Sequence, residues 1–119
     1  MHCIGTDIIE ISRIEGAIAR WGDNFLRRVY TDLELSLYRE RPASLAARFA
    51  AKEAVVKALG RPPGINFRQV EILSEPGGKP VVILHGAADD QAARLGLNSF
   101  AVSLSHSREY AIAMVHGEG

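Results

Sequence analysis

The chain has 119 residues, 47% of them hydrophobic and 24% charged, which suits one globular domain with a modest core. Its 14 basic and 14 acidic side chains cancel, so no global field draws the molecule to nucleic acid or anionic lipid. With one cysteine (Cys3), no signal-peptide pattern and no apolar run near the about 18 residues of a membrane span, we expect a single cytoplasmic domain, residues 1–119, without disulfides.

The first half of the chain predicts a strand followed by helices. The apolar, β-branched run over residues 3–9 is typical of a strand. Ser12, with Glu15 three residues later, has the spacing of a capping box, so we expect a helix to begin there. The positions that recur at helical spacing on it, and that should face the core, are Ile14, Ala17, Ile18 and Trp21. Further helical segments are expected over 25–30, over 32–38 with Thr31 as cap, and over 43–59, ending at Gly60.

The second half predicts two hairpins and a helix. Strands are expected over 70–73 and 80–84, on either side of a turn at 75–79. Residues 87–95 follow as a helix, and strands over 100–105 and 110–115 form the second hairpin around 106–108. The expected fold is therefore α+β, with a mainly antiparallel sheet packed against one long helix.

Asp7 is unusual because it lies in the run 4–9, which otherwise favours burial on both strand faces. A buried carboxylate needs a positive partner. The simple interpretation is an aspartate that caps the following helix. The alternative is a ligand site, since Gly5 on the same face leaves room for something to approach, although glycine is also typical of a bulge.

The long helix carries a second unusual group of charges. Its apolar stripe consists of Leu45, Phe49, Val56 and Leu59. Glu53 lies at the edge of this stripe with Lys57 one turn on, and small alanines beside them leave open space. An intrahelical Glu–Lys pair, worth about 0.2–0.5 kcal/mol, is the simple interpretation. However, Arg48 and Lys52 are like charges one turn apart, and Lys52 falls within the stripe, which favours a bound polyanion or a covering subunit.

The segment Ser105-His106-Ser107 at the second hairpin offers hydroxyls, an imidazole and turn amides that can hold phosphate oxygens. A merely polar turn is the commoner situation. No nucleophile elbow, cysteine–histidine zinc spacing, Walker loop or dinucleotide fingerprint is present. Cys3 is expected to be a core residue rather than a nucleophile.

Taken together, these segments resemble the holo-acyl-carrier-protein synthase family of phosphopantetheinyl transferases. The matching segments are Ile4-Gly5-Thr6-Asp7-Ile8, Arg13-Ile14, the helix from Arg48 to Gly60, Gly78-Lys79-Pro80, and Ser105-His106 with Tyr110-Ala111. They occur in order over nearly the whole chain, and the block Arg-Phe-Ala-Ala-Lys-Glu-Ala is the most specific part. The resemblance implies the 4′-phosphopantetheinyl transferase fold and a Mg²⁺-dependent transfer of phosphopantetheine from coenzyme A to a serine of an acyl carrier protein. Adenosine 3′,5′-bisphosphate would be released, in a step of fatty acid and lipid metabolism.

The resemblance also implies roles for individual residues. Asp7 and Glu53 would hold Mg²⁺ against the pyrophosphate, and Glu53, or a water on the metal that it orients, would take the serine proton. Lys57 would neutralise phosphate or leaving-group charge. The residues expected to bind coenzyme A are Arg48, Lys52, Gly78, Lys79, Pro80, His106 and Ser107. The family forms homotrimers with sites between subunits, so the turn at 78–80 is expected to reach the adenine of a neighbour. The expected docking residues for an acidic carrier protein are Arg13, Arg20, Arg27 and Arg28.

Two departures from the family pattern concern loops. Segment 38–45 is shorter than in many members, and Glu75-Pro76 stands where a polar Asn or Asp is common. Two other functions remain open at this point. One is a different Mg²⁺-dependent phosphoryl-transfer or nucleotide-hydrolysing enzyme, and the other is a non-catalytic trimer that binds coenzyme A.

Overall fold

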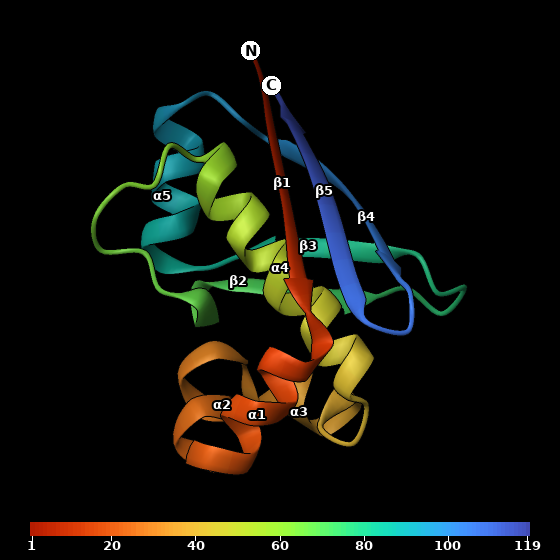
Figure 1. Cartoon of the computed structure of the whole chain (residues 1–119). Helices are drawn as coiled ribbons and strands as arrows, with labels where there is room; N and C mark the ends of the chain where they lie inside the picture. Colours follow the sequence, from red (N-terminus) through yellow and green to blue (C-terminus); the bar gives the residue numbers. More distant parts are fainter.

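The computed structural model describes residues 1–119 and has the expected α+β class (Figure 1). The elements are β1 (His2–Glu10), α1 (Ile11–Trp21), α2 (Asp23–Val29), α3 (Asp32–Tyr38), α4 (Pro42–Ala58), the 3₁₀ helix η1 (Phe67–Gln69), β2 (Val70–Ser74), β3 (Pro80–Leu84), α5 (Gly86–Arg94), β4 (Ser99–His106) and β5 (Tyr110–Glu118). Every predicted helix and strand is present, most with ends within one or two residues, while β5 continues to Glu118 and η1 was not predicted. None of the helices is long and apolar enough to cross a bilayer.

The strands form a three-stranded antiparallel sheet, β1-β5-β4, and a separate hairpin, β2-β3. The first and last strands pair along their whole length, from His2 opposite Glu118 to Glu10 opposite Tyr110. The two chain termini therefore lie side by side at one end of the sheet (Figure 1). The prediction of mainly antiparallel strands is confirmed.

Helix α4 packs on the inner face of the three-stranded sheet, and this contact depends on small residues. A Cβ atom on Gly5 would overlap the carbonyl oxygen of Ala54, so only glycine lets β1 approach α4 this closely. Ala46 and Ala50, the alanines expected to leave open space, are fully buried, as is Ala54. The expectation that Gly5 and the alanines leave space for a ligand is thus wrong, because strand and helix fill that space themselves. Cys3 packs against the core, as expected.

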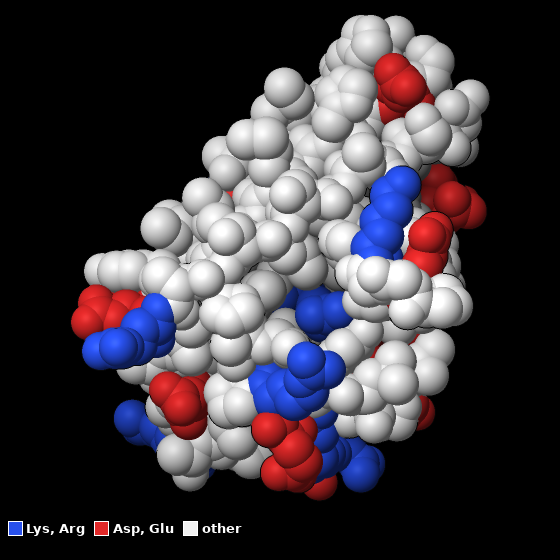
Figure 2. All heavy atoms as spheres, turned by 90° about the vertical axis from the view of Figure 1, so that its right-hand side faces the viewer, with Lys and Arg blue, Asp and Glu red and all other residues white.

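The outer face of the sheet is apolar and exposed. Ile4, Ile8, Ile112 and Met114 are 70%, 60%, 43% and 58% exposed, respectively. Figure 2 shows that charged side chains gather at the helical end and along one rim, leaving a broad area without Lys, Arg, Asp or Glu. The first strand was expected to be buried on both faces. In the single chain only its inner face is buried, so this expectation is wrong.

The predicted start of α1 is also wrong. The helix begins at Ile11, directly after β1, and no side chain caps it. Instead, the backbone N–H of Ile11 donates to the carbonyl oxygen of Glu109, at 2.9 Å, in the β4–β5 turn. Trp21 is 55% exposed rather than in the core. By contrast, Thr31 caps α3 as predicted, in a capping box with Glu34.

Candidate functional site

Asp7 has the positive partner that its burial requires, and that partner is Lys57. Asp7 points from the inner face of β1, and its Oδ1 lies 2.8 Å from the Nζ atom of Lys57 on α4. Lys57 also donates to the carbonyl oxygen of Thr6 at 3.0 Å. The two side chains are only 18% and 34% exposed. Asp7 therefore does not cap α1, and Lys57 pairs across to the strand rather than with Glu53 on its own helix.

Glu53 lies one helical turn before Lys57 and is half-buried. No hydrogen bond or ion pair engages its carboxylate, although its neighbour Lys57 is paired with Asp7. Its carboxylate oxygens are open to solvent, so they are free to bind a cation. Two acids supplied by separate elements give the oxygen ligands that Mg²⁺ prefers, so the residues present fit this metal.

Lys52 has a structural role, since its ammonium group bonds only to groups of its own chain. Its Nζ atom donates to Glu34 Oε1 at 2.7 Å and to the carbonyl oxygens of Phe67 at 3.0 Å and Val70 at 2.6 Å. These bonds use all three donors of the ammonium group. Both side chains of the Lys52–Glu34 pair are fully buried, and burial lowers the pKa of Lys52 while the nearby Glu34 carboxylate opposes that shift.

Two predictions for Lys52 are therefore corrected. With no donor left and no exposed surface, Lys52 does not contact coenzyme A. It also needs no second subunit to cover it, because α3, η1 and β2 of its own chain do so. The decisive partner, Glu34, was not recognised because sequence spacing does not show which helices pack together.

A second group of polar residues surrounds Arg48, which is almost fully buried. Its Nε donates to the carbonyl oxygen of Ile72 at 3.1 Å and its Nη2 to Ser74 Oγ at 3.0 Å. The guanidinium lies 3.5 Å from the centre of the Tyr38 ring. An arginine has five N–H donors, so some remain free after these contacts.

Arg48 and three other predicted coenzyme A contacts, Gly78, Pro80 and His106, line one hollow. A hollow of about 210 Å³ is lined by Ser44, Ala47, Arg48, Ser74, Gly78, Pro80, Leu104 and His106. His106 is the last residue of β4 rather than part of the turn. Ser107 and Lys79 do not line the hollow. Ser107 instead closes the β4–β5 turn, with its N–H donating to the Tyr110 carbonyl and its Oγ accepting from the Tyr110 N–H.

The group of Asp7, Glu53 and Lys57 includes one edge strand of the three-stranded sheet, and the hollow beside Arg48 includes the other. Asp7 belongs to β1 at one edge and His106 to β4 at the other, with β5 between them. Neighbouring strands are about 4.8 Å apart, so about 10 Å separates the two edge strands. Within one chain, Asp7 and His106 thus stand on different strands at the two edges of the sheet.

The arginines expected to dock a carrier protein all lie exposed on α1 and α2, at the helical end where charges gather in Figure 2. Arg27 pairs with Asp23 at 3.8 Å, and the guanidinium of Arg20 lies 5.0 Å from the centre of the Trp21 ring. Arg13 and Arg28 make no ion pair. The helical end thus offers cations and an exposed indole beside each other.

The model of the 4′-phosphopantetheinyl transferase superfamily matches residues 3–115. The chain belongs to the holo-[acyl-carrier-protein] synthase family. A holo-[acyl-carrier-protein] synthase of Dehalococcoides mccartyi strain CBDB1 is 57% identical over 111 residues, covering 93% of each chain. That of Herpetosiphon aurantiacus is 47% identical over 127 residues and covers all of both chains. The Helicobacter pylori holo-[acyl-carrier-protein] synthase in complex with coenzyme A superposes with a TM-score of 0.87, at 32% identity, over 97% of this chain and 99% of that one. The fold and the transferase class of this member of the family follow from these matches.

Proposed function

We propose that this enzyme transfers 4′-phosphopantetheine from coenzyme A to a serine of an apo acyl carrier protein, using Mg²⁺ and releasing adenosine 3′,5′-bisphosphate. The observation that carries the proposal is the unpaired Glu53 carboxylate one turn from the Asp7–Lys57 pair. The coenzyme A complex of the Helicobacter pylori relative supports coenzyme A as the donor.

In the proposed reaction, the carrier serine Oγ attacks the phosphorus that bears the pantetheine arm. A new P–O bond forms, and the P–O bond to the adenosine bisphosphate breaks. Glu53, or a water that it orients, takes the serine proton. Mg²⁺ held by Asp7 and Glu53 would polarise the pyrophosphate and offset its charge.

In this proposal Lys57 neutralises the negative charge that develops on the leaving phosphate. Its ammonium is held by Asp7 and by the Thr6 carbonyl, so it is already oriented beside the two acids before substrate binds. Phosphate oxygens can then share its remaining donor without a large rearrangement.

The Arg48 hollow would hold phosphate of the adenylate part. Arg48 is fixed by Tyr38, Ile72, Ser74 and the Ser44 carbonyl, so its free N–H groups are preorganised, and His106 lines the same hollow with its imidazole. Gly78 and Pro80 line the same hollow and would border the adenine. Lys79 and Ser107 are proposed as peripheral contacts at its rim.

We further propose a homotrimer that completes each site between subunits. The exposed apolar face of the sheet supplies a surface that a neighbour would cover. Asp7 and His106 stand on opposite edge strands, so each would supply half of a site, and a cyclic arrangement would bring the Asp7 edge of one subunit to the His106 edge of the next. The arginines of α1 and α2 would receive the acidic carrier protein.

Mass spectrometry of an apo carrier protein incubated with coenzyme A and the enzyme tests this function. The carrier should gain the mass of one phosphopantetheine group with Mg²⁺ and almost none with a chelator. Cleavage of coenzyme A with an unmodified carrier would indicate a hydrolase instead. Binding of coenzyme A without any turnover would indicate a non-catalytic module.

A further inference from the structure

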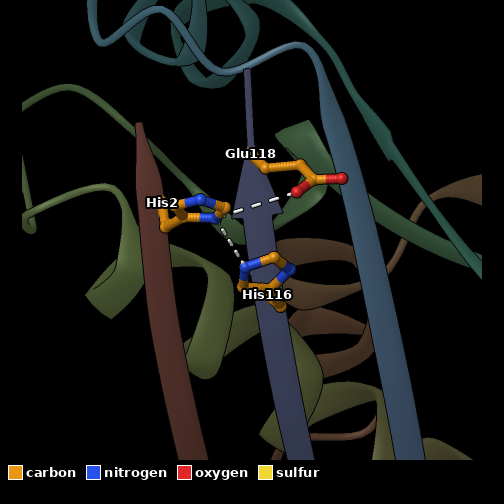
Figure 3. A group of neighbouring side chains, drawn as sticks. All are labelled: His2, His116 and Glu118. Carbon is orange, nitrogen blue, oxygen red and sulfur yellow. Dashed lines mark hydrogen bonds and ion pairs between the residues drawn. The ribbon is translucent and has the colours of Figure 1, made fainter.

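Two histidines and a glutamate meet at the end of the sheet where the chain termini lie. His2 stands on β1, and His116 and Glu118 stand on β5, all on the outer face (Figure 3). The Nδ1 atom of His2 lies 3.1 Å from Nε2 of His116 and 3.7 Å from Oε2 of Glu118. One ligand atom from each residue lies within 4.8 Å of the other two.

We propose that His2, His116 and Glu118 form a binding site for a divalent transition metal of the Zn²⁺ type. Imidazole and carboxylate are ordinary zinc ligands, with bonds of about 2.0–2.2 Å, so neighbouring ligand atoms of a tetrahedral site lie about 3.3 Å apart. The separations of 3.1 and 3.7 Å bracket that value. Three protein ligands leave one position for water.

The imidazole pair places two nitrogens, both of them possible metal ligands, next to each other. The ring centres are 5.2 Å apart, the planes are inclined by 22°, and Nδ1 of His2 lies 3.1 Å from Nε2 of His116. Without a metal, one nitrogen must carry a hydrogen to bond the other. A metal needs both lone pairs, so it binds when both rings are neutral and is released on acidification.

This site is separate from the proposed transfer site. His2 and Asp7 are five residues apart on β1, which is about 17 Å at about 3.4 Å per residue, and they point to opposite faces of the sheet. The donor sets also differ, since imidazoles select transition metals whereas carboxylates and water suit Mg²⁺.

A metal at this position would cross-link the first strand, β1, to the last strand, β5. At this end the Met1 amine donates to the Gly119 carbonyl at 3.1 Å, and the Gly119 N–H donates back to the Met1 carbonyl at 3.1 Å. Because the metal binds only when both strands are paired, it should raise the melting temperature of the folded chain.

Titration of the untagged, metal-free enzyme with Zn²⁺ tests the proposal, with Co²⁺ as a spectroscopic probe. We expect one Zn²⁺ per chain, absorption bands typical of four-coordinate Co²⁺, a higher Tm with Zn²⁺, and loss of binding at pH 5. His2→Gln, His116→Gln and Glu118→Gln should each weaken binding at least tenfold, since even changes around metal ligands cost about 10–100-fold.

His85→Asn is the matched control. His85 also pairs with a carboxylate, Glu71, at 3.1 Å, but no second imidazole is beside it, so its loss should leave Zn²⁺ binding unchanged. His2→Gln changes a side chain that is 69% exposed, so this variant should fold. Fewer than one Zn²⁺ per chain, or unchanged affinity in both His2→Gln and His116→Gln, would overturn the site. Transfer to the carrier in Mg²⁺ should be normal in His85→Asn and in Glu118→Gln, which lies at the end of β5 beyond the apolar residues proposed as the subunit contact. Weakened Zn²⁺ binding with normal transfer in Glu118→Gln would therefore show that the two proposals fail independently.

Discussion

Two lysine–carboxylate pairs on α4 have nearly the same length and opposite surroundings. Lys52–Glu34 measures 2.7 Å and is fully buried, whereas Lys57–Asp7 measures 2.8 Å and is partly exposed. A fully buried pair whose lysine has no free donor has a structural role, and removing one partner leaves an uncompensated charge in the core. A partly exposed pair beside an unpaired acid can exchange partners with a substrate. Burial, rather than residue type, therefore separates the structural lysine from the proposed catalytic one.

Replacing Lys52 by methionine tests this assignment. Lys52→Met should lower the free energy of unfolding by about 3–5 kcal/mol, because Glu34 keeps its charge in the core. Lys52→Met combined with Glu34→Gln should recover part of this loss, since the stranded charge is removed. Urea denaturation of the wild type and both variants measures the effect. A stable Lys52→Met protein that binds coenzyme A poorly would instead show that Lys52 contacts coenzyme A.

At the level of elements, the contact between β1 and α4 holds Asp7 beside Lys57. Gly5→Ala should strongly destabilise the fold, because its Cβ would overlap the Ala54 carbonyl of a buried helix. Gly16→Ala is the matched control. Gly16 lies within α1 with nothing near the position of a Cβ, so alanine there should stabilise by about 0.5–1 kcal/mol. Thermal unfolding should show opposite shifts in Tm, and equal Tm values would contradict the close contact.

Periodicity and turn residues sufficed to predict which segments become helices and strands, because those preferences are local. The start of α1 was not predictable in this way, since its first N–H is satisfied by the distant Glu109 carbonyl. The same holds for the Asp7–Lys57 contact and for the His2–His116 pair, which need the pairing of the first and last strands. The family block on α4 indicated Glu53 and Lys57 but gave no means of separating them from Lys52.

Helix α1 carries the prediction on carrier docking. Exposed ion pairs contribute only about 0.2–1 kcal/mol each, so the test uses charge reversal at two positions. Arg13→Glu with Arg20→Glu should raise KM for the carrier several-fold at low salt, and the effect should shrink as salt rises, because the Debye length is about 8 Å at physiological ionic strength. KM for coenzyme A should hardly change.

The control for this pair changes the net charge equally but elsewhere. Arg61→Glu with Arg94→Glu alters exposed residues after α4 and at the end of α5, away from α1. Steady-state kinetics with each substrate varied in turn distinguishes the two pairs. An unchanged carrier KM in the α1 variant, or an equal rise in the control, would leave α1 as an ordinary solvated helix.

At the scale of the whole molecule, the apolar sheet face and the two edge clusters lead to the same proposal of a cyclic assembly. Ile112 lies on the central strand of the exposed face and is 43% exposed, whereas Leu33 on α3 is 49% exposed and lies off the sheet. Ile112→Asp should dissociate the trimer and abolish transfer, while Leu33→Asp should leave both intact. Sedimentation equilibrium gives the masses. A wild-type enzyme that is active as a monomer would refute the assembly.

The most direct test of the transferase site is the rate of phosphopantetheine transfer by Glu53→Gln at saturating Mg²⁺ and coenzyme A. Glutamine keeps the size of the side chain but removes its negative charge and its ability to take a proton. The rate should fall by about 10²–10⁴-fold, the usual contribution of a general base, while the circular dichroism spectrum and oligomer mass stay those of the wild type. A variant that retains near wild-type turnover under these conditions would contradict the site built from Asp7, Glu53 and Lys57.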